Sequence, residues 1–398
     1  MMLYRFILFG ILLAIGVHTS AQAEPKNSDC QHTETYQGEP LYSAFNGERL
    51  PSSVDLSGNL ETELTAQLNE AVNWTLQNTN TPGITAAVGI RDRGLWSTTQ
   101  GLASTQPPTE VGDDSVFWWA SVGKMFTASI VLQMVAENQL SLDQTVNNWF
   151  PDYPQAQYIT IRDLLTHTGG VFSFQQDREF RRRIGYSTPE EPIALSAEQG
   201  ADFCPGMYWY YSNTGYVMLA KIIEAIANKP FAEVVEKRLI EPLGLTQTYA
   251  LNFQALPPQL ARGHIEGKPD PKFKPSLPFG AGNIVASAED MTIFLAALLS
   301  GEVYPQSLLQ DSLSTLYPMF DSGTYYGQGI MLYDLDRESD SVQWLGHSGG
   351  SPSVRAVVAY DLERDVFVAV AMNGNVPAEA LAYRLVEIVE SYRKSNGN

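Results

Sequence analysis

The sequence contains few of the residues on which several classes of protein depend. Only 2 of its 398 residues are cysteine and 5 are histidine, and no two histidines have a metal-ligand spacing such as H-x-x-x-H. These counts argue against a disulfide-dense scaffold and a zinc hydrolase, and no motif predicts a cofactor. Basic residues are also scarce: 25 Lys and Arg against 44 Asp and Glu give a formal net charge of −19. Such a charge repels nucleic acid and anionic lipid, so we expect neither as a partner.

Long hydrophobic runs are missing except at the N-terminus. Residues 6–17 form a short apolar run behind Arg5, and the A-Q-A stretch that ends at residue 23 is typical of a signal-peptide cleavage site. The run is too short for a membrane-spanning helix. The sequence therefore predicts a secretory signal over 1–23, cleaved before Glu24, and a periplasmic or secreted protein with no stable membrane span. An uncleaved membrane anchor is the alternative.

The two cysteines offer one disulfide to an exported chain. Cys30 lies in the polar N-terminal segment and Cys204 lies in the middle of the sequence. A bond between them would tie the N-terminal tail to the body of the protein. Two free, buried thiols are the alternative.

The sequence shows no internal repeat and no low-complexity segment. Residues 24–58 are polar and irregular, which predicts a surface tail before a domain over 59–398. Within that domain, 59–103 and 281–398 hold the strand patterns, whereas 104–280 is rich in helical ones. We expect one sheet built from both ends of the chain, an inserted helical lobe, and a ligand site between the two lobes.

The stretch SVFWWASVGKMFTASIVLQMVA, residues 115–136, holds a single charged residue, Lys124. A lysine in so apolar a run needs a partner or a function. If Ser121 opens the helix that follows, Lys124 lies on the same face, one turn later. A desolvated lysine can activate a serine hydroxyl, and the helix N-terminus favours developing negative charge. Alone, the S-x-x-K pattern is a weak signal.

A second candidate group is Tyr211-Ser212-Asn213, which precedes a helix predicted from Thr214. Tyr211 could act as a phenolate base near Lys124, and Asn213 could bind a substrate amide. Under the alternative interpretation the tyrosine belongs to the core and Asn213 is the helix N-cap.

Residues 346–350 read G-H-S-G-G and match the G-x-S-x-G nucleophile elbow. An elbow needs a histidine after the serine, and none follows Ser348. Read as His347-x-Gly349 at a strand edge, the same residues suit another role. A strand with glycines at 349 and 350 can present backbone N–H groups to an oxyanion, and His347 adds a donor.

In combination, these three elements resemble the serine β-lactamase and penicillin-binding-protein superfamily, especially its class C β-lactamase and DD-carboxypeptidase branch. That family's ordered pattern of S-x-x-K, Y-x-N and K/H-x-G is present as Ser121-Val-Gly-Lys124, Tyr211-Ser-Asn213 and His347-Ser-Gly349. Three further stretches are similar to the family: ITIRDLLTHTGG (159–170), the segment from YSNTGYV to EPLGLT (211–246) and GAGNIVASAEDMTIFLAALLSGE (280–302). The resemblance covers residues 84 to 390.

The resemblance implies an α+β fold in which an antiparallel sheet, with helices on both faces, stands beside an all-helical lobe. It also implies a mechanism. Ser121 attacks a carbonyl while Lys124 and Tyr211 share the proton transfers, Asn213 binds substrate, and the N–H groups of Ser121 and Gly350 form the oxyanion hole. Water then releases the acyl group.

The chain departs from the class C enzymes at His347, where they usually have lysine. Histidine is more typical of DD-carboxypeptidases and esterase-like members, and a neutral imidazole attracts a carboxylate less than an ammonium does. We therefore expect an exported D-alanyl-D-alanine carboxypeptidase-like hydrolase. The alternatives are a β-lactamase or esterase of the same fold, and a non-catalytic binder of a peptidoglycan-like ligand. The expected substrate is a small peptide, β-lactam or ester, and no sequence feature specifies an oligomeric state.

Several aromatic residues flank these motifs. We expect them to wall the site, and a place in the core is the alternative: Trp118, Trp119, Phe172 and Phe174. His167, within the DLLTHTGG stretch, is expected to be a hydrogen-bonded structural histidine.

Overall fold

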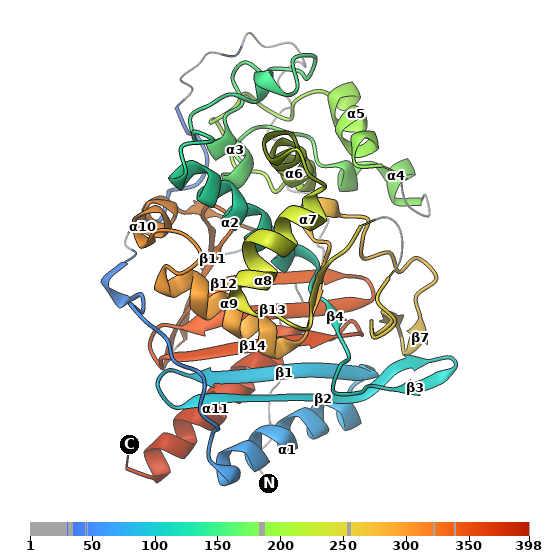
Figure 1. The fold of residues 1–398 in the computed structure, drawn as a ribbon, viewed down its shortest axis with the longest axis vertical. Helices are drawn as coiled ribbons and strands as arrows, with labels where there is room; N and C mark the ends of the chain where they lie inside the picture. The colour runs from blue at the N-terminus through green and yellow to red at the C-terminus, as the bar shows by residue number, and fades with distance from the viewer. Residues whose placement is uncertain are drawn as a thin grey trace.

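A computed structural model describes residues 30, 35–43, 45, 47–182, 188–252, 256–320, 323–337 and 340–397. The predicted signal peptide lies outside these residues, as does part of the predicted tail. In Figure 1 a large sheet occupies the lower half of the molecule, and most of the helices lie above it. Within the described ranges, no helix is both long and apolar enough to cross a membrane.

The secondary structure alternates between the two halves of the molecule. The longer helices are α1 (Thr62–Asn78), α2 (Gly123–Ala136), α5 (Glu190–Gln199), α6 (Asn213–Ala227), α9 (Ala288–Ser300), α10 (Gln306–Ser314) and α11 (Ala378–Ser395). The shorter ones are η2 (Ala120–Val122), α3 (Ile161–Thr166), η4 (Phe174–Gln176), α4 (Arg178–Arg182), α7 (Phe231–Val235), α8 (Glu241–Leu243) and η6 (Phe279–Ala281). The strands of the main sheet are β1 (Gly83–Ile90), β2 (Gly94–Thr105), β3 (Pro108–Glu110), β9 (Tyr317–Pro318), β10 (Thr324–Tyr326), β11 (Met331–Arg337), β12 (Asp340–Ser351), β13 (Val354–Asp361) and β14 (Val366–Met372).

The main sheet joins the two ends of the chain. Among the described residues it has the strand order β3-β2-β1-β14-β13-β12-β11-β10-β9, and its neighbouring strands are antiparallel. β1 pairs with β14, so strands separated by most of the sequence lie side by side at its centre. The predicted α+β class, with one antiparallel sheet built from both termini, is confirmed.

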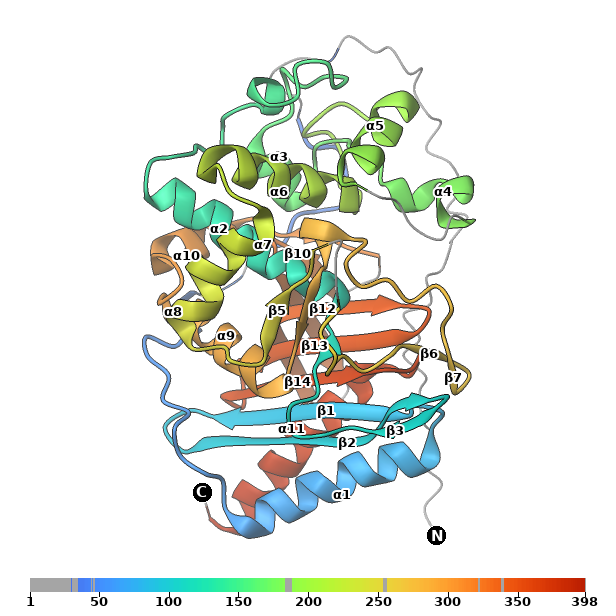
Figure 2. The ribbon, with the colours of Figure 1, turned by 45° about the vertical axis from the view of Figure 1, so that its right-hand side comes forward.

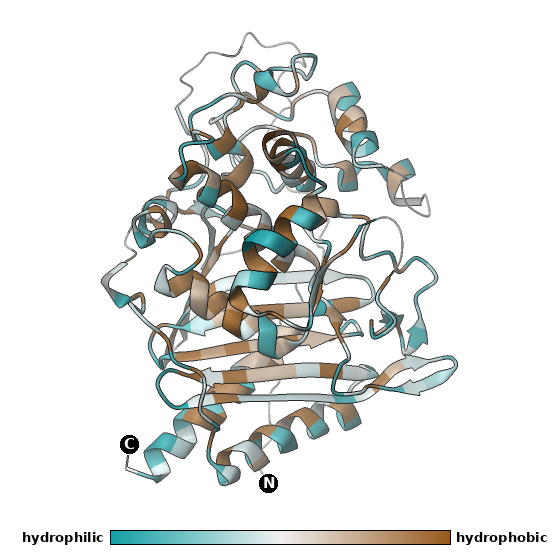
Figure 3. Cartoon of the chain, in the orientation of Figure 1, coloured by the Kyte–Doolittle hydropathy of each residue, from teal (hydrophilic) through white to brown (hydrophobic). Residues whose placement is uncertain are grey.

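Helices cover both faces of this sheet because its central strands are apolar on both sides. In β14 the valines and Met372 face α1 and α11, whereas Phe367, Ala369 and Ala371 pack with α9. This is the period-2 alternation of a strand buried on two faces. α1 and α11 lie on the side of the sheet away from the helical half (Figure 2). Hydrophobic residues concentrate on the central strands and on α2 and α6, and polar residues lie on the outer faces of the peripheral helices (Figure 3).

The lobe over 104–280 differs from an all-helical one in a way that bears on the site. α2 and α6 form its core, but β4 (Phe117–Trp118) and β5 (Thr248–Ala250) lie in the same segment and pair with β8 (Ile284–Ala286). A second small pair joins β6 (His264–Ile265) and β7 (Lys268–Pro269). These strands are only two or three residues long, which is too short for a periodic signal in the sequence.

Candidate active site

Ser121 lies in η2, the tight turn that leads directly into α2. The preceding strand β4 is held in place because Trp119 donates its backbone N–H to the Ile284 carbonyl at 3.1 Å. Between them, Ala120 adopts a positive φ of 46°. A non-glycine residue in this region costs roughly 1–3 kcal/mol, and such strain concentrates at functional sites. The strained turn leaves the Ser121 side chain partly exposed at the start of the helix.

The segment after η6 approaches this turn closely because residue 282 is glycine. A Cβ at Gly282 would lie 2.5 Å from the Ala120 carbonyl oxygen, a distance that real side chains do not tolerate. The indole of Trp118 donates to the Gly282 carbonyl at 2.7 Å and fixes the approach. As a result, the carbonyl of the neighbouring Ala281 points into the site at Lys124.

Lys124 is fully buried, one helical turn after Ser121. Its Nζ donates to the Asn213 Oδ1 at 2.6 Å and to the Ala281 carbonyl at 2.7 Å, and it lies 3.3 Å from the Ser121 Oγ. It also lies 4.8 Å from the centre of the Tyr211 ring. The S-x-x-K pair and the Y-x-N pair, 87 to 92 residues apart in sequence, therefore converge on one nitrogen.

Burial lowers the pKa of Lys124 well below its ordinary value, because the apolar surroundings disfavour the charged form. A neutral amine has two N–H bonds and one lone pair. The two N–H bonds match the two carbonyl-type oxygens of Asn213 and Ala281, which can only accept. The lone pair is then left for the Ser121 hydroxyl.

Tyr211 approaches the same serine from the end of the loop before α6. Its side chain is hydrogen-bonded to that of Ser121. Burial raises the pKa of the Tyr211 phenol, and the hydrogen bond to Ser121 opposes this only in part. The phenol therefore keeps its proton at neutral pH, so the structure does not support a phenolate base.

Helix α6 starts one residue earlier than predicted, and its N-cap is not Asn213. The helix begins at Asn213, and Ser212 is the N-cap, with its Oγ accepting from the Gly215 N–H at 3.3 Å. The predicted start at Thr214, and the alternative in which Asn213 is the N-cap, are therefore wrong. Because Ser212 takes the capping role, the Asn213 side chain is free to accept from Lys124 and donate to Gln175.

Strand β12 supplies the third side of the site. It extends past the end of β11, whose first residue, Met331, pairs with Gly346, so its last residues have a partner only in β13. A Cβ at Gly349 would lie 2.3 Å from the Trp119 carbonyl oxygen and 2.8 Å from the Ser121 nitrogen. Only glycine lets the strand run this close to the turn. Gly350, the next residue, is exposed.

His347 is placed beside Lys124 but faces inward. The ring is fully buried, and its Nδ1 donates to the Ser348 carbonyl at 2.5 Å, since a carbonyl can only accept. Its Nε2 is therefore an acceptor, 3.2 Å from the Tyr326 hydroxyl. Burial, with a smaller effect from Lys124, lowers the pKa of His347 to about 3. The imidazole is neutral, and both nitrogens are engaged within the protein rather than offered as the donor expected from the sequence.

Three of the four aromatic residues that the sequence offered as a wall have other packing partners. Trp119 and Phe174 belong to the hydrophobic core, and Trp118 packs edge-on against Phe273. The wall is instead built by two residues that the motifs missed, Trp209 and Phe320, whose rings contact Tyr211. Tyr326 contacts Tyr211 and His347 and hydrogen-bonds to Tyr216, but Tyr216 and Tyr326 are fully buried in the core. Tyr326 is the last residue of β10, whose three residues are too few to give a periodic signal.

His167 lies behind this wall as a buried structural residue. Its Nδ1 accepts from the Ser212 backbone N–H at 3.1 Å, so it positions the cap of α6 and, through it, Tyr211 and Asn213. Among the described residues, no group of three or more His, Cys, Asp or Glu side chains could hold a metal ion.

Comparisons with known proteins agree with this fold. The sequence matches the Beta-lactamase family over residues 62–392. Penicillin-binding protein 4 from Amycolatopsis lactamdurans is 29% identical over 321 residues, covering 74% of this chain and 81% of that protein. Esterase EstB from Burkholderia gladioli is 25% identical over 291 residues, covering 63% and 74%. The crystal structure of the D-amino acid amidase from Ochrobactrum anthropi SV3 is similar with a TM-score of 0.72 and 25% identity, covering 82% of this chain and 99% of that one.

Proposed function

Since the chain belongs to the beta-lactamase family of serine hydrolases, we propose that it is an exported enzyme that forms an acyl-enzyme on Ser121. One observation carries the proposal: the Lys124 Nζ lies 3.3 Å from the Ser121 Oγ, with two acceptor oxygens taking its other contacts. A neutral amine in this geometry can remove the hydroxyl proton. Export rests on the predicted signal over residues 1–23.

In the proposed acylation step, the Ser121 Oγ attacks the substrate carbonyl carbon while its proton passes to Lys124. Burial favours the neutral amine of Lys124 and the protonated phenol of Tyr211, so we assign the base to the lysine and a proton relay to the tyrosine. When the carbonyl reforms, the bond to the leaving group breaks. The proton that Ser121 gave up then passes through Tyr211 to the leaving nitrogen or oxygen.

The tetrahedral intermediate carries its negative charge on the former carbonyl oxygen. We assign its stabilisation to the backbone N–H groups of Ser121 and Gly350. The close approach of Gly349 to the Ser121 nitrogen supports this, because it brings the end of β12 beside the turn. In the second half of the reaction, water attacks the ester, gives a proton to Lys124, and the proton returns to the Ser121 Oγ as the acid leaves.

The proposed substrates are peptides that end in D-alanyl-D-alanine, with Asn213 binding the substrate amide. Relatives named penicillin-binding protein support this class, and so do a relative named teichoic acid D-alanine hydrolase and a structural neighbour named D-stereospecific amidohydrolase. Their shared feature is a D-configured or β-lactam acyl donor.

A second candidate, favoured by one observation, is an amidase or esterase for substrates whose leaving group has no carboxylate. A carboxypeptidase must bind the carboxylate of the residue that it releases. His347 offers no charge for it, because its pKa is about 3 and both its nitrogens are engaged. Arg355, the cation that pairs with Gly350 from β13, donates to the Ser351 and Val354 carbonyls and so does not supply this charge either. The neighbour named D-amino acid amidase and the relative named esterase fit this alternative.

A matched substrate panel separates these functions. Purified protein is assayed with a D-Ala-D-Ala peptide, D-alanine amide, p-nitrophenyl esters and nitrocefin, and a fluorescent penicillin measures acylation directly. We expect label on the wild type and none on Ser121→Ala. Faster release of D-alanine from the peptide than of ammonia from the amide supports the carboxypeptidase, and the reverse order supports the amidase. If no substrate is turned over and ligand affinity survives Ser121→Ala, the protein is a binder and the proposal is wrong.

A further inference from the structure

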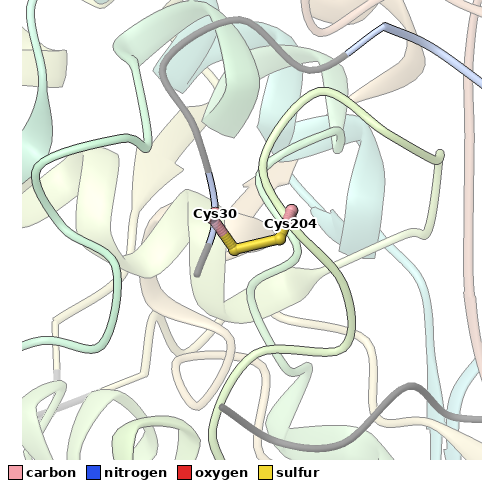
Figure 4. Close-up of a disulfide and its surroundings, with 2 residues drawn as sticks. All are labelled: Cys30 and Cys204. Atoms are coloured by element: carbon pink, nitrogen blue, oxygen red, sulfur yellow. A yellow bond between two sulfur atoms is a disulfide. The ribbon is translucent and has the colours of Figure 1, made fainter. Parts of the chain in front are cut away.

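The described N-terminal residues, Cys30 and 35–42, form a segment outside the catalytic groups, which we call the strap. Its first anchor is the disulfide between Cys30 and Cys204, with a Cα–Cα distance of 5.4 Å (Figure 4). Its second anchor is a backbone hydrogen bond, in which Gln37 donates to the Met207 carbonyl at 2.7 Å. Both anchors fall on the loop over 202–210, which ends immediately before Tyr211.

The other end of the strap is fixed to the β9–β10 hairpin. Tyr42 and Leu316 exchange two backbone hydrogen bonds of 3.0 and 3.1 Å. The ring of Tyr42 packs on Tyr325 at 4.6 Å between centroids, and that of Tyr36 packs edge-on against Tyr317 at 5.3 Å. The strap therefore bridges two segments that are separated by about a hundred residues of sequence.

Those two segments carry the aromatic wall beside the nucleophile. The loop contributes Trp209 and the hairpin contributes Phe320, and their rings meet edge-on at 5.5 Å. Phe320 also contacts Tyr211 at 5.9 Å, and yet its side chain is 67% exposed. An exposed phenylalanine beside a catalytic tyrosine is an apolar surface with room for a further apolar group.

We propose that the strap is a positioning element that holds Trp209 and Phe320 together as the binding surface for the acyl side chain of the substrate. Without it, the loop keeps its inner hydrogen bonds to 167–170, but the β9–β10 hairpin, next to Phe320, loses the strap's connection to the loop. The wall then samples several arrangements, and each substrate must order it on binding. This inference rests on the proposed hydrolase activity and goes beyond it by assigning side-chain selectivity to residues remote from Ser121.

The wall contacts the acyl side chain equally in the ground state and the transition state, so the strap should affect KM more than kcat. The test compares p-nitrophenyl acetate with the p-nitrophenyl ester of an N-acyl-D-phenylalanine, for wild type, Cys30→Ser and Tyr42→Ala. We expect each variant to raise KM for the aromatic ester about fivefold or more, with kcat within about twofold, and to leave both constants for the acetate nearly unchanged. Reductant should reproduce the Cys30→Ser result in the wild type and do nothing to Cys30→Ser itself, which is the matched control.

Hydrogen exchange of the same proteins provides a readout that needs no activity. We expect Cys30→Ser to speed amide exchange in both 202–210 and 316–326, whereas a strap that anchors only one side would affect 202–210 alone. If Cys30→Ser fails to fold, reduction of the folded wild type replaces it. Unchanged KM for the aromatic ester, or exchange unchanged in 316–326, overturns the inference. If the wild type hydrolyses neither ester, the proposed function fails, and the exchange data still decide whether the strap couples the two segments.

Discussion

At the scale of single residues, the activity of the site depends on how burial changes the pKa of Lys124. Its pKa is lowered by desolvation, so the neutral, proton-accepting form exists at a lower pH than in a free lysine. We predict that kcat/KM rises with pH through this lowered pKa and falls as acid protonates the amine. His347 does not contribute to this limb, since its pKa of about 3 keeps it neutral throughout. The measurement is a pH profile of ester hydrolysis between pH 5 and 9.

The control variants for this profile are Lys124→Met and Tyr211→Phe. Lys124→Met removes the base, so activity should drop by roughly 10²–10⁴-fold and the remaining rate should lose the acid limb. Tyr211→Phe should lower kcat but keep the limb, because Tyr211 stays protonated over this range. An acid limb that survives Lys124→Met, or disappears with Tyr211→Phe, would assign the base to the tyrosine instead.

Tyr326 is a residue that we expect to act through His347. Its hydroxyl contacts the His347 Nε2 at 3.2 Å and the Tyr216 hydroxyl at 3.3 Å. We predict that Tyr326→Phe, which keeps the ring, destabilises the protein by about 1–3 kcal/mol, because a buried imidazole nitrogen loses its partner. Urea unfolding of the wild type and the variant measures this difference in unfolding free energy. Tyr325→Phe, in the neighbouring and less buried position, is the matched control, and equal effects of the two would remove the special role of the Tyr326 hydroxyl.

At the scale of elements, the distance between β12 and η2 determines whether the oxyanion site can form. We predict that Gly349→Ala lowers the rate of acylation by fluorescent penicillin by at least about 10²-fold, because the new methyl group would lie 2.3 Å from the Trp119 carbonyl oxygen. Gly215→Ala is the control, since its methyl group would meet Leu164 at an ordinary 3.6 Å. Circular dichroism of both variants checks the fold. A Gly349→Ala enzyme that acylates at the wild-type rate would show that this approach is not needed.

The same elements show what the sequence could and could not predict. Ser121 and Lys124 were predictable because residues three apart in a helix share a face, and both fall within one apolar run. The carbonyl of Ala281 was not, because a backbone oxygen carries no side-chain signal and reaches Lys124 only through the close packing at Gly282. The aromatic wall was not predictable for a related reason. Periodicity identifies Trp119 and Phe174 as apolar but does not distinguish core from site, and the contact between Trp209 and Phe320 depends on the tertiary fold.

At the scale of the whole molecule, the central sheet was predictable because strand patterns occur at both ends of the chain. The order of the strands was harder to predict from the sequence, because β1 and its partner β14 are separated by most of the chain. The exposed surface carries most of the acidic excess of the chain, whereas the few histidines at 167, 264 and 347 are buried. Acid can therefore destabilise the fold by protonating these buried histidines.

Buried neutral histidines make the stability of the fold depend on pH in a definite direction. The folded-state pKa of His347 is about 3, below its ordinary value of 6.5. Below pH 6.5 the unfolded chain binds a proton that the folded protein excludes, so stability is complete above this pH and is lost as the pH falls toward 3. We predict that His347→Gln removes about 2 kcal/mol of the loss in unfolding free energy between pH 7 and 5. Urea unfolding at both pH values measures this difference. His167 stays buried in both proteins, so its contribution cancels in the comparison. If the unfolding free energies of the wild type and His347→Gln fall in parallel with pH, His347 is protonated in the folded state. The neutral imidazole on which the amidase alternative rests would then be wrong.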